Sequence, residues 1–245
     1  MYDPKGNGKD KSVPDVHFLE AKPPAHLSKI VHRFLELKTD GHLAQDYKFH
    51  ALPDACAYIV FDQLDRTITG VSKLRAISEE FNLGRSFHFV NIRFLPGVWQ
   101  DSAEPISYGL LNTHYTGEMP LVELSHSLAG QDFEAKLDVL ISFVEDLLDQ
   151  KKVAPNPVTG IILSHLNEIH TVADMADLCE MSARQLQRTL KRTTGFAPHD
   201  FLKILRLQQA LSGDEASYAD QSHFIHSFRR ATGYTPGKYN KKFDV

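Results

Sequence analysis

The chain has 245 residues, enough for one large domain or two of ordinary size with a buried hydrophobic core. With 42% apolar and 24% charged residues, the composition is that of a globular protein, which excludes disordered, collagen-like and disulfide-stabilised miniprotein classes. The net charge of −4 argues against a nonspecific polyanion binder. The N-terminus is polar, and every apolar run is far shorter than the ~18 residues that a membrane-spanning helix needs. The sequence therefore predicts a cytoplasmic protein without a signal peptide.

The first 100 residues carry mostly strand signals. Residues 1–16 are rich in Gly, Lys, Asp and Pro and have no periodic apolar face, so we expect a disordered tail that packs against nothing. Residues 24–37 predict a helix, because their apolar side chains are spaced for one buried face. Strands are expected at residues 16–19, 49–52, 55–61, 67–71 and 87–94. This part of the chain therefore predicts a small β-barrel or sandwich.

An amphipathic helix is expected after the polar stretch of residues 101–130. Between residues 133 and 152 the apolar positions form one stripe with a period of 3.6. Packing inside the first domain is the favoured explanation of this stripe, and contact with a second copy of the chain is the alternative. Pro155 and Pro157 then end the helix and mark a domain boundary.

Beyond this boundary the chain is expected to be helical to its end. Helices are predicted at residues 161–169, 172–179, 183–192, 201–211 and 222–232. The fold class is therefore α+β, with a β-rich barrel- or sandwich-like domain over residues 17–154 followed by an all-α domain over residues 155–245. The second part holds 11 basic and 9 acidic residues and the first 16 and 22, a weak indication that the helical part has an anionic partner.

The helical part contains an internal repeat. Residues 184–201 align with residues 222–239 at an offset of 38, position by position. Leu186 aligns with Phe224, Leu190 with Phe228, and the basic pair Lys191 and Arg192 with Arg229 and Arg230. Each copy then continues into a Thr-Gly pair, an aromatic residue and a proline. Agreement over so many chemical classes indicates two copies of one structural unit.

The first copy has the pattern of a helix-turn-helix. Thr171 can cap a first helix, and Ser182 can accept from the free N–H groups of a second. Leu186 and Leu190 fall on one face of the second helix. The opposite face carries the candidate base-reading residues Arg184, Gln187 and Arg188.

Arginine and glutamine are suited to paired hydrogen bonds with guanine and adenine edges in the major groove. On an isolated helix such a face is more often simply solvated, but the repeat favours recognition. Ser182, Lys191 and Arg192 lie where contacts with phosphate would fix the orientation of this helix. Gly195 predicts a left-handed C-cap, and Pro198 the start of the next helix.

Two long motifs resemble the DNA-binding domain of AraC/XylS-type transcription regulators. The first is M-S-x-R-x-L-x-R-x-L-K-x-x-x-G-x-x-P-x-x-F over residues 181–201, and the second is D-Q-S-H-F-x-x-x-F-R-R-x-x-G-Y-T-P-x-x-Y over residues 220–239. The resemblance covers about the last 85 residues. It implies two helix-turn-helix units joined by a long helix at residues 201–211, with two recognition helices in successive turns of the major groove.

The resemblance also implies roles for residues of the second unit. Ser222, Ile225 and His226 match base-reading positions, and Arg229 and Arg230 are candidate phosphate contacts. More weakly, residues 50–54, 69–70 and 92–97 resemble elements of the β-rich sensor domain that precedes many such regulators.

The second unit departs from the family pattern. Residues 212–217 are turn-like and lack an apolar stripe, so a supporting helix with its turn is expected to be missing. Ser222, Ile225 and His226 are also poorer base readers than the residues of the first unit. We therefore expect the helix of residues 183–192 to dominate any sequence specificity.

Other chemistry finds little support in the sequence. Thirteen His residues show no metal-ligand spacing, and His50 and His88 would converge only if their strands were adjacent, so no metal or other cofactor is expected. The glycine motifs of nucleotide and hydrolase sites do not occur, so no enzyme activity is expected. Cys56 and Cys179 are expected to be buried or idle thiols in a reducing compartment.

Aromatic side chains of the β-rich part allow two interpretations. They could line an apolar ligand pocket, although a simple core is favoured. The residues concerned are Tyr58, Phe87, Phe89, Phe94 and Trp99.

The sequence thus predicts a sequence-specific transcription regulator with promoter DNA as its partner. RNA polymerase, a small-molecule effector and a second copy of the chain are further candidate partners, and no membrane is expected. One alternative is a truncated regulator homologue that pairs with an intact regulator and does not bind DNA independently. A cupin-like enzyme fused to a helical tail would need a converging His or acid cluster, which the sequence does not indicate.

Overall fold

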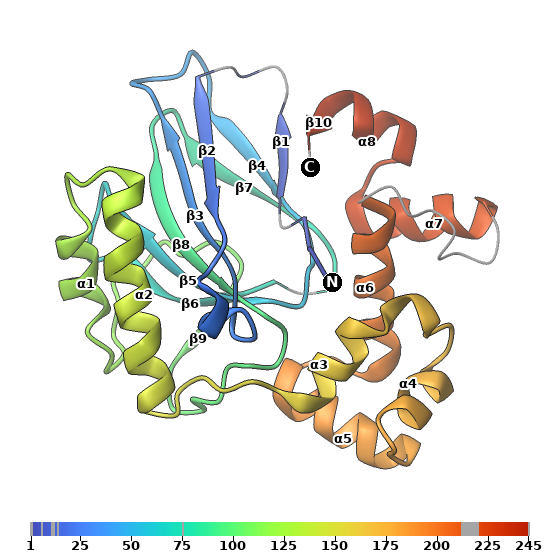
Figure 1. The fold of residues 1–245 in the computed structure, drawn as a ribbon. Helices are drawn as coiled ribbons and strands as arrows, with labels where there is room; N and C mark the ends of the chain where they lie inside the picture. Colours follow the sequence, from blue (N-terminus) through green and yellow to red (C-terminus); the bar gives the residue numbers. More distant parts are fainter. Residues whose placement is uncertain are drawn as a thin grey trace.

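The computed structural model describes residues 2–5, 7–10, 13, 15–74, 76–211 and 221–244. The N-terminal part consists of strands followed by two helices, and the C-terminal part is mostly helical, as the α+β prediction requires (Figure 1). The N-terminal strands are β1 (Asn7–Asp10), β2 (Val16–Ala21), β3 (Val31–Thr39), β4 (Tyr47–Ala51), β5 (Ala57–Asp62), β6 (Thr69–Lys73), β7 (Glu79–Gly84), β8 (His88–Phe94) and β9 (Ile106–Tyr108). The five strand predictions are confirmed as β2, β4, β5, β6 and β8. Strands β1, β7 and β9 were not predicted.

The strands form two sheets that enclose an apolar interior. The larger sheet has the order β2-β3-β8-β5-β6-β9 and the smaller one the order β10-β1-β4-β7, where β10 (Phe243–Asp244) comes from the end of the chain. All pairings are antiparallel except that of β6 with β9. Alternate residues of the strands therefore face either the space between the sheets or the outside of the sandwich.

The helix predicted at residues 24–37 is wrong. The structure has a short 3-10 turn at Ala25–Leu27, followed by strand β3 in the interior of the larger sheet. Phe34 faces the core on the outer side of this sheet, whereas Leu35 and Leu37 line the space between the sheets. Because both faces of β3 are covered, its apolar residues do not alternate with polar ones and mimic the spacing of a helix.

The disordered tail expected at residues 1–16 is also wrong for the residues that the structure describes. Tyr2 is 7% exposed, and its hydroxyl donates to the carbonyl of Asp54 at 2.8 Å. The carboxylate of Asp3 lies 2.7 Å from His32 Nε2 and 2.8 Å from Arg33 Nη2. Strand β1 pairs with both β4 and β10. The described residues of this segment are held by partners distant in sequence, which the composition of the segment does not indicate.

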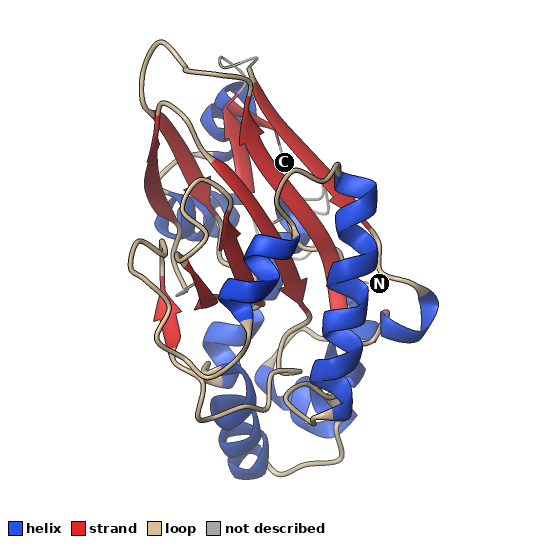
Figure 2. Cartoon of the chain, turned by 90° about the vertical axis from the view of Figure 1, so that its left-hand side faces the viewer, coloured by secondary structure: helices blue, strands red, loops and turns tan. Residues whose placement is uncertain are grey.

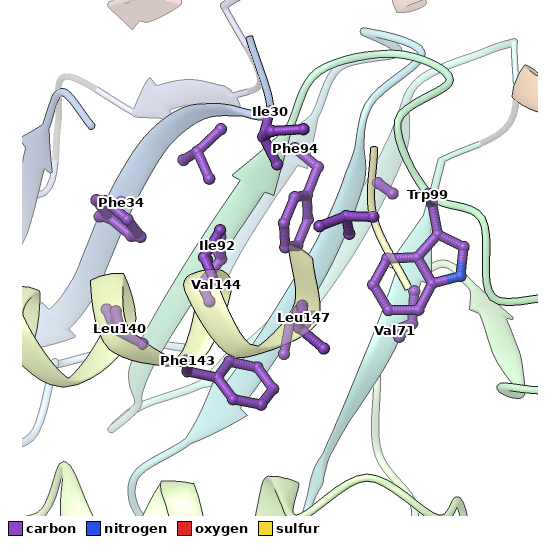
Figure 3. Packing of buried hydrophobic residues seen from close by; sticks show 14 of the residues in the cluster. Ile30, Phe34, Val71, Ile92, Phe94, Trp99, Leu140, Phe143, Val144 and Leu147 are labelled. Atoms are coloured by element: carbon purple, nitrogen blue, oxygen red, sulfur yellow. The ribbon is translucent and has the colours of Figure 1, made fainter. Parts of the chain in front are cut away.

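Two helices cover the outer face of the larger sheet (Figure 2). They are α1 (Leu121–Ser127), which was not predicted, and α2 (Phe133–Asp149), which confirms the amphipathic helix. Leu140, Val144 and Leu147 of α2 pack in one cluster with Phe34 and Ile92 of the sheet (Figure 3). The apolar stripe thus contributes to the core of the N-terminal part.

A buried ion pair also joins α2 to the sheet. Lys136 Nζ lies 2.5 Å from Glu36 Oε1 of β3, and the two side chains are 2% and 1% exposed. His88 Nε2 lies 2.8 Å from the same carboxylate oxygen. Burial raises the pKa of Glu36, but the hydrogen bonds from His88 and Lys136 outweigh it and lower this pKa to about 2.

The C-terminal helices follow the predicted order. They are α3 (Pro157–Ser164), a 3-10 turn (Leu166–Glu168), α4 (Val172–Leu178), α5 (Ala183–Thr194), α6 (Pro198–Leu211), α7 (Gln221–Thr232) and α8 (Pro236–Lys242). Four of the five helix predictions are confirmed as α4 to α7, whereas the helix predicted at residues 161–169 instead begins at Pro157 and ends at Ser164, and α8 was not predicted. Asn156 caps α3, so the domain boundary expected near residue 155 falls in the connection between α2 and α3. No helix among the described residues is long and apolar enough to span a bilayer.

The two parts of the chain are joined by a buried glutamine. Gln208 of α6 is 1% exposed and accepts the N–H of Lys5 at 2.6 Å. Its amide group donates to the carbonyl of Pro53 at 2.7 Å, so one side chain holds two segments of the N-terminal part against α6.

We expect Gln208→Ala to lower the free energy of unfolding by about 1–3 kcal/mol, because it leaves buried backbone groups without partners. Urea unfolding of the purified chain measures this change. Gln209→Ala is the matched control, since the Gln209 amide donates to Asn167 at the surface, at 2.8 Å, and its loss should cost under about 1 kcal/mol. Equal effects of the two substitutions would contradict this role of Gln208.

Candidate nucleic-acid interface

Helices α4 and α5 form a helix-turn-helix with a capping box at each N-terminus. Thr171 accepts the N–H of Asp174 at 3.1 Å, and the Asp174 carboxylate accepts the N–H of Thr171 at 2.8 Å. Ser182 and Gln185 make the same reciprocal pair at the start of α5, at 3.3 and 2.9 Å. These bonds satisfy free N–H groups and fix where each helix begins, as the sequence predicts.

The turns on either side of α5 use left-handed backbone. Glu180, between α4 and α5, has a φ of 53°. Gly195 ends α5 with a φ of 85°, which confirms the predicted C-cap. Both ends of α5 are therefore fixed by local geometry.

One face of α5 packs into the C-terminal core. Leu186 and Leu190 are fully buried in a cluster with Met175 of α4 and with Phe201 and Leu205 of α6. The orientation of α5 about its own axis is set by this packing. Its opposite face therefore points away from the core.

The opposite face presents the candidate base-reading residues. Arg184, Gln187 and Arg188 are all exposed. Among the described residues, no carboxylate forms an ion pair with Arg184 or Arg188. Their guanidinium groups are therefore available to an external acceptor.

The candidate phosphate contacts of α5 differ in how they are engaged. The hydroxyl of Ser182 takes part in the cap of the helix, and Lys191 Nζ donates to the carbonyl of Gly195 at 2.9 Å. Arg192 is exposed. Ser182 and Lys191 thus have structural roles in the free chain, and all three phosphate contacts stay predictions.

The second unit presents α7 on an aromatic cluster. Phe224 and Phe228 are 4% and 2% exposed and pack with Leu207 of α6 and with Tyr239 and Phe243. The ring centroids of Phe224 and Phe228 lie 5.6 Å apart, and those of Phe228 and Tyr239 5.5 Å apart. The repeat alignment holds in the structure, because Leu186 and Leu190 are buried at the matching positions of α5.

The polar face of α7 carries Ile225, His226, Arg229 and Arg230, all exposed. The side chain of Ser222 lies outside the described part of the chain. The missing supporting helix was inferred from residues 212–217, which also lie outside it. The base-reading role of α7 stays a prediction.

Helix α6 supports both units. Phe201 and Leu205 belong to the cluster under α5, whereas Leu207 belongs to the cluster under α7. One continuous helix therefore carries the two candidate recognition helices. This arrangement matches the long connecting helix that the family resemblance implies.

Helix α8 adds basic residues that the sequence analysis did not name. Lys238 and Lys241 are exposed near the end of the chain. Their signal was present as the basic segment P-G-K-Y-N-K-K, but no helix was predicted there. They are further candidates for contacts with phosphate.

The histidines considered for a metal site lie apart. His50 belongs to β4 of the smaller sheet and stacks on Phe243 with ring centroids 5.1 Å apart. His88 belongs to β8 of the larger sheet, where it contacts Glu36. In the described ranges, no group of three or more His, Cys, Asp or Glu residues could hold a metal ion.

The aromatic residues considered for a pocket divide between cavity and core. Tyr58 and Phe89 line a cavity between the two sheets. Phe94 and Trp99 belong to the core under α2, with ring centroids 5.9 Å apart, and Phe87 packs against Tyr47. Cys56 is buried and Cys179 half-buried, both as free thiols.

A family model and a curated protein each match part of the chain. A family described as "Domain of unknown function (DUF6597)" matches residues 19–107. The HTH-type transcriptional activator RhaS of Escherichia fergusonii is 27% identical over 148 residues, which are 51% of this chain and 53% of RhaS. The chain therefore spans about half the length of this curated relative.

Two solved structures of ToxT from Vibrio cholerae are also similar. An apo form from strain SCE256 is 11% identical, with a TM-score of 0.40 over 94% of this chain and 97% of that one. A second crystal form at 1.65 Å resolution is 10% identical, with a TM-score of 0.40 over 94% of this chain and 98% of that one.

Proposed function

We propose that this chain, which is of the AraC/XylS type by its double motif and its likeness to RhaS, is a transcription regulator that binds promoter DNA sequence-specifically. The observation that carries the proposal is the exposed face of α5, with Arg184, Gln187 and Arg188 on a helix that is capped at both ends and packed on its other side. Helix α5 provides most of the specificity and α7 the smaller share.

The chemistry of the α5 face supports base reading. A bidentate arginine discriminates guanine and a bidentate glutamine discriminates adenine, each by about 1–3 kcal/mol. These side chains are spaced three and four residues apart and therefore share one face of the helix. Three such readers can address neighbouring base pairs in one major groove.

The basic residues around this face support contact with the DNA backbone. Arg192 on α5 and Arg229 and Arg230 on α7 are exposed. Ser182 and Lys191 lie at the two ends of α5. Contacts of this kind position the helices but carry no sequence information.

The division of labour in the chain is part of the proposal. Residues 155–245 form the DNA-binding part, and residues 17–154 form a sensor or dimerisation part. The N-terminal segment of residues 2–10 contributes to both, because Lys5 contacts α6 and β1 pairs with β10. A small-molecule effector, a second copy of the chain and RNA polymerase are the partners consistent with such a regulator.

The test is a salt titration of binding to promoter-region DNA and to random-sequence DNA. We expect Arg184→Ala and Arg188→Ala each to weaken binding to promoter DNA by about tenfold to a hundredfold, because each removes a base contact worth about 1–3 kcal/mol. Binding to random DNA should change much less. Fluorescence anisotropy with labelled duplexes measures both.

Arg192→Ala is the matched control, since it removes a charge of the same kind from the same helix. We expect it to weaken binding to both DNAs alike and to reduce the salt slope by about one. The proposal would be overturned if the chain bound promoter and random DNA equally weakly and if Arg184→Ala and Arg188→Ala left this binding unchanged. It would favour a homologue that acts by pairing with an intact regulator.

A further inference from the structure

A cavity of about 100 Å³ lies between the two sheets of the N-terminal part. Side chains of both sheets and of the loop after β9 line it, and most of them are aliphatic or aromatic. Among them are Leu35, Leu37, Phe49, Phe81, Phe89 and Leu111. The cavity is therefore an apolar site in which a small molecule could be removed from water.

One polar atom in the cavity wall has no hydrogen-bond partner among the described residues. Asn91 of β8 lines the cavity, and its Oδ1 is buried without a hydrogen bond. The other polar groups of the wall are already engaged, because Ser72 donates to the carbonyl of Gly109 at 2.8 Å and the Tyr58 hydroxyl donates to Asp54. An unpaired amide in such surroundings costs free energy, which a ligand with a complementary polar group would recover.

The absence of charged groups from the described wall favours an uncharged ligand. Among the residues that the structure describes, no Asp, Glu, Lys or Arg side chain lines the cavity. Arg93, two residues along β8 from Asn91, lies outside the lining, and its Nη2 is 3.5 Å from Glu20 Oε1. An ionised ligand would lose its hydration without gaining a charged partner, so a neutral molecule is favoured.

The size of the cavity limits the ligand to about one ring or a short chain. An apolar protein cavity of about 150 Å³ is known to accept benzene. A cavity of comparable size with one free amide fits a molecule of that class that carries a single hydroxyl or amide group.

We propose that this cavity binds a small uncharged molecule made of one apolar ring or short chain and one hydroxyl or amide group, which hydrogen-bonds to Asn91. A ligand of this class would be the effector of the sensor role proposed for the N-terminal part, and only this link to a sensor role rests on the proposed function. Binding itself depends only on the cavity.

The experiment uses the full chain without DNA and three probes of similar size. Isothermal titration calorimetry compares benzyl alcohol, toluene and benzoate. We expect saturable binding of benzyl alcohol and toluene and no binding of benzoate. Absence of saturable binding for both neutral probes, or tighter binding of benzoate, would overturn the proposal.

Variants test the part played by the amide. Asn91→Leu should raise the ratio of the benzyl alcohol Kd to the toluene Kd by about tenfold, because it removes the hydrogen bond and leaves an apolar wall. Asn91→Val makes the same test if Asn91→Leu does not fold. Asn82→Leu is the control, since Asn82 is an exposed strand residue that lies outside the cavity lining, and it should leave the ratio unchanged.

An unchanged ratio in the Asn91 variants would overturn the role of this residue. The outcome is independent of DNA binding. Failure of the cavity to bind neutral probes leaves the DNA titration unaffected, and loss of sequence specificity in that titration leaves the calorimetry unaffected.

Discussion

Replacement of Lys136 by Met should lower the free energy of unfolding by about 3–5 kcal/mol. The substitution keeps the length of the side chain but removes the charge that lies 2.5 Å from the buried carboxylate of Glu36. The remaining partners are weaker, since His88 is charged only when protonated and Lys38 Nζ is 3.6 Å away and 37% exposed. Urea unfolding measures the change in stability.

Lys152→Met is the control for this prediction. Lys152 Nζ also lies 2.5 Å from a carboxylate, that of Asp101, but the Lys152 side chain is 27% exposed. Its loss should cost about 1 kcal/mol or less, because water screens the charges. The double variant Glu36→Leu/Lys136→Met should regain much of the lost stability, since it leaves no unpaired charge. Similar effects of Lys136→Met and Lys152→Met would contradict the importance of burial.

The ion pair also predicts a dependence on pH. The pKa of Glu36 is about 2 in the folded chain, below that of a carboxyl group in the unfolded chain. The contribution of Glu36 to stability is therefore fully present above the unfolded pKa and is lost as the pH falls towards 2. Near neutral pH this contribution is complete, so Glu36 should cause little change of stability with pH in that range.

Phe228→Ala should also lower the free energy of unfolding by about 3–5 kcal/mol, and it should prevent the second unit from binding DNA. The Phe228 ring is 2% exposed between the rings of Phe224 and Tyr239. Truncation leaves a cavity under α7 that aromatic neighbours cannot readily fill. Helix α7 would then lose its fixed position, and nuclease protection of bound DNA should shrink to the site of α5.

The matched control is Ile225→Ala on the same helix. Ile225 is 39% exposed, so its truncation should change stability by about 0.5 kcal/mol or less. Protection of the full site by Phe228→Ala, or equal destabilisation by the two variants, would contradict the bracing role of Phe228.

The sequence predicts those elements whose burial pattern is regular. Helices α2, α5 and α7 each bury one face, so their residues repeat at the helical period, and the caps of α5 follow from Ser182 and Gly195. Strand β3 is buried on both faces, and its pattern is ambiguous for that reason. Short edge elements such as β9 and β10 carry too few residues for any pattern.

The candidate sites differ in the same way. The exposed face of α5 could be predicted, because the repeat and the spacing of Arg184 and Arg188 are properties of the sequence alone. The order of residues 2–5 depends on Asp54 and Gln208, which are distant in the chain. The unpaired Oδ1 of Asn91 could not be predicted, because only the three-dimensional structure shows which polar groups lie near it.

Selection of DNA from a random-sequence duplex library tests the central claim most directly. The full wild-type chain should enrich one motif, and Arg184→Ala/Arg188→Ala should lose the part of the motif that α5 reads while still retaining weak binding. Failure of the wild-type chain to enrich any motif, although it binds the library, would contradict sequence-specific reading by α5.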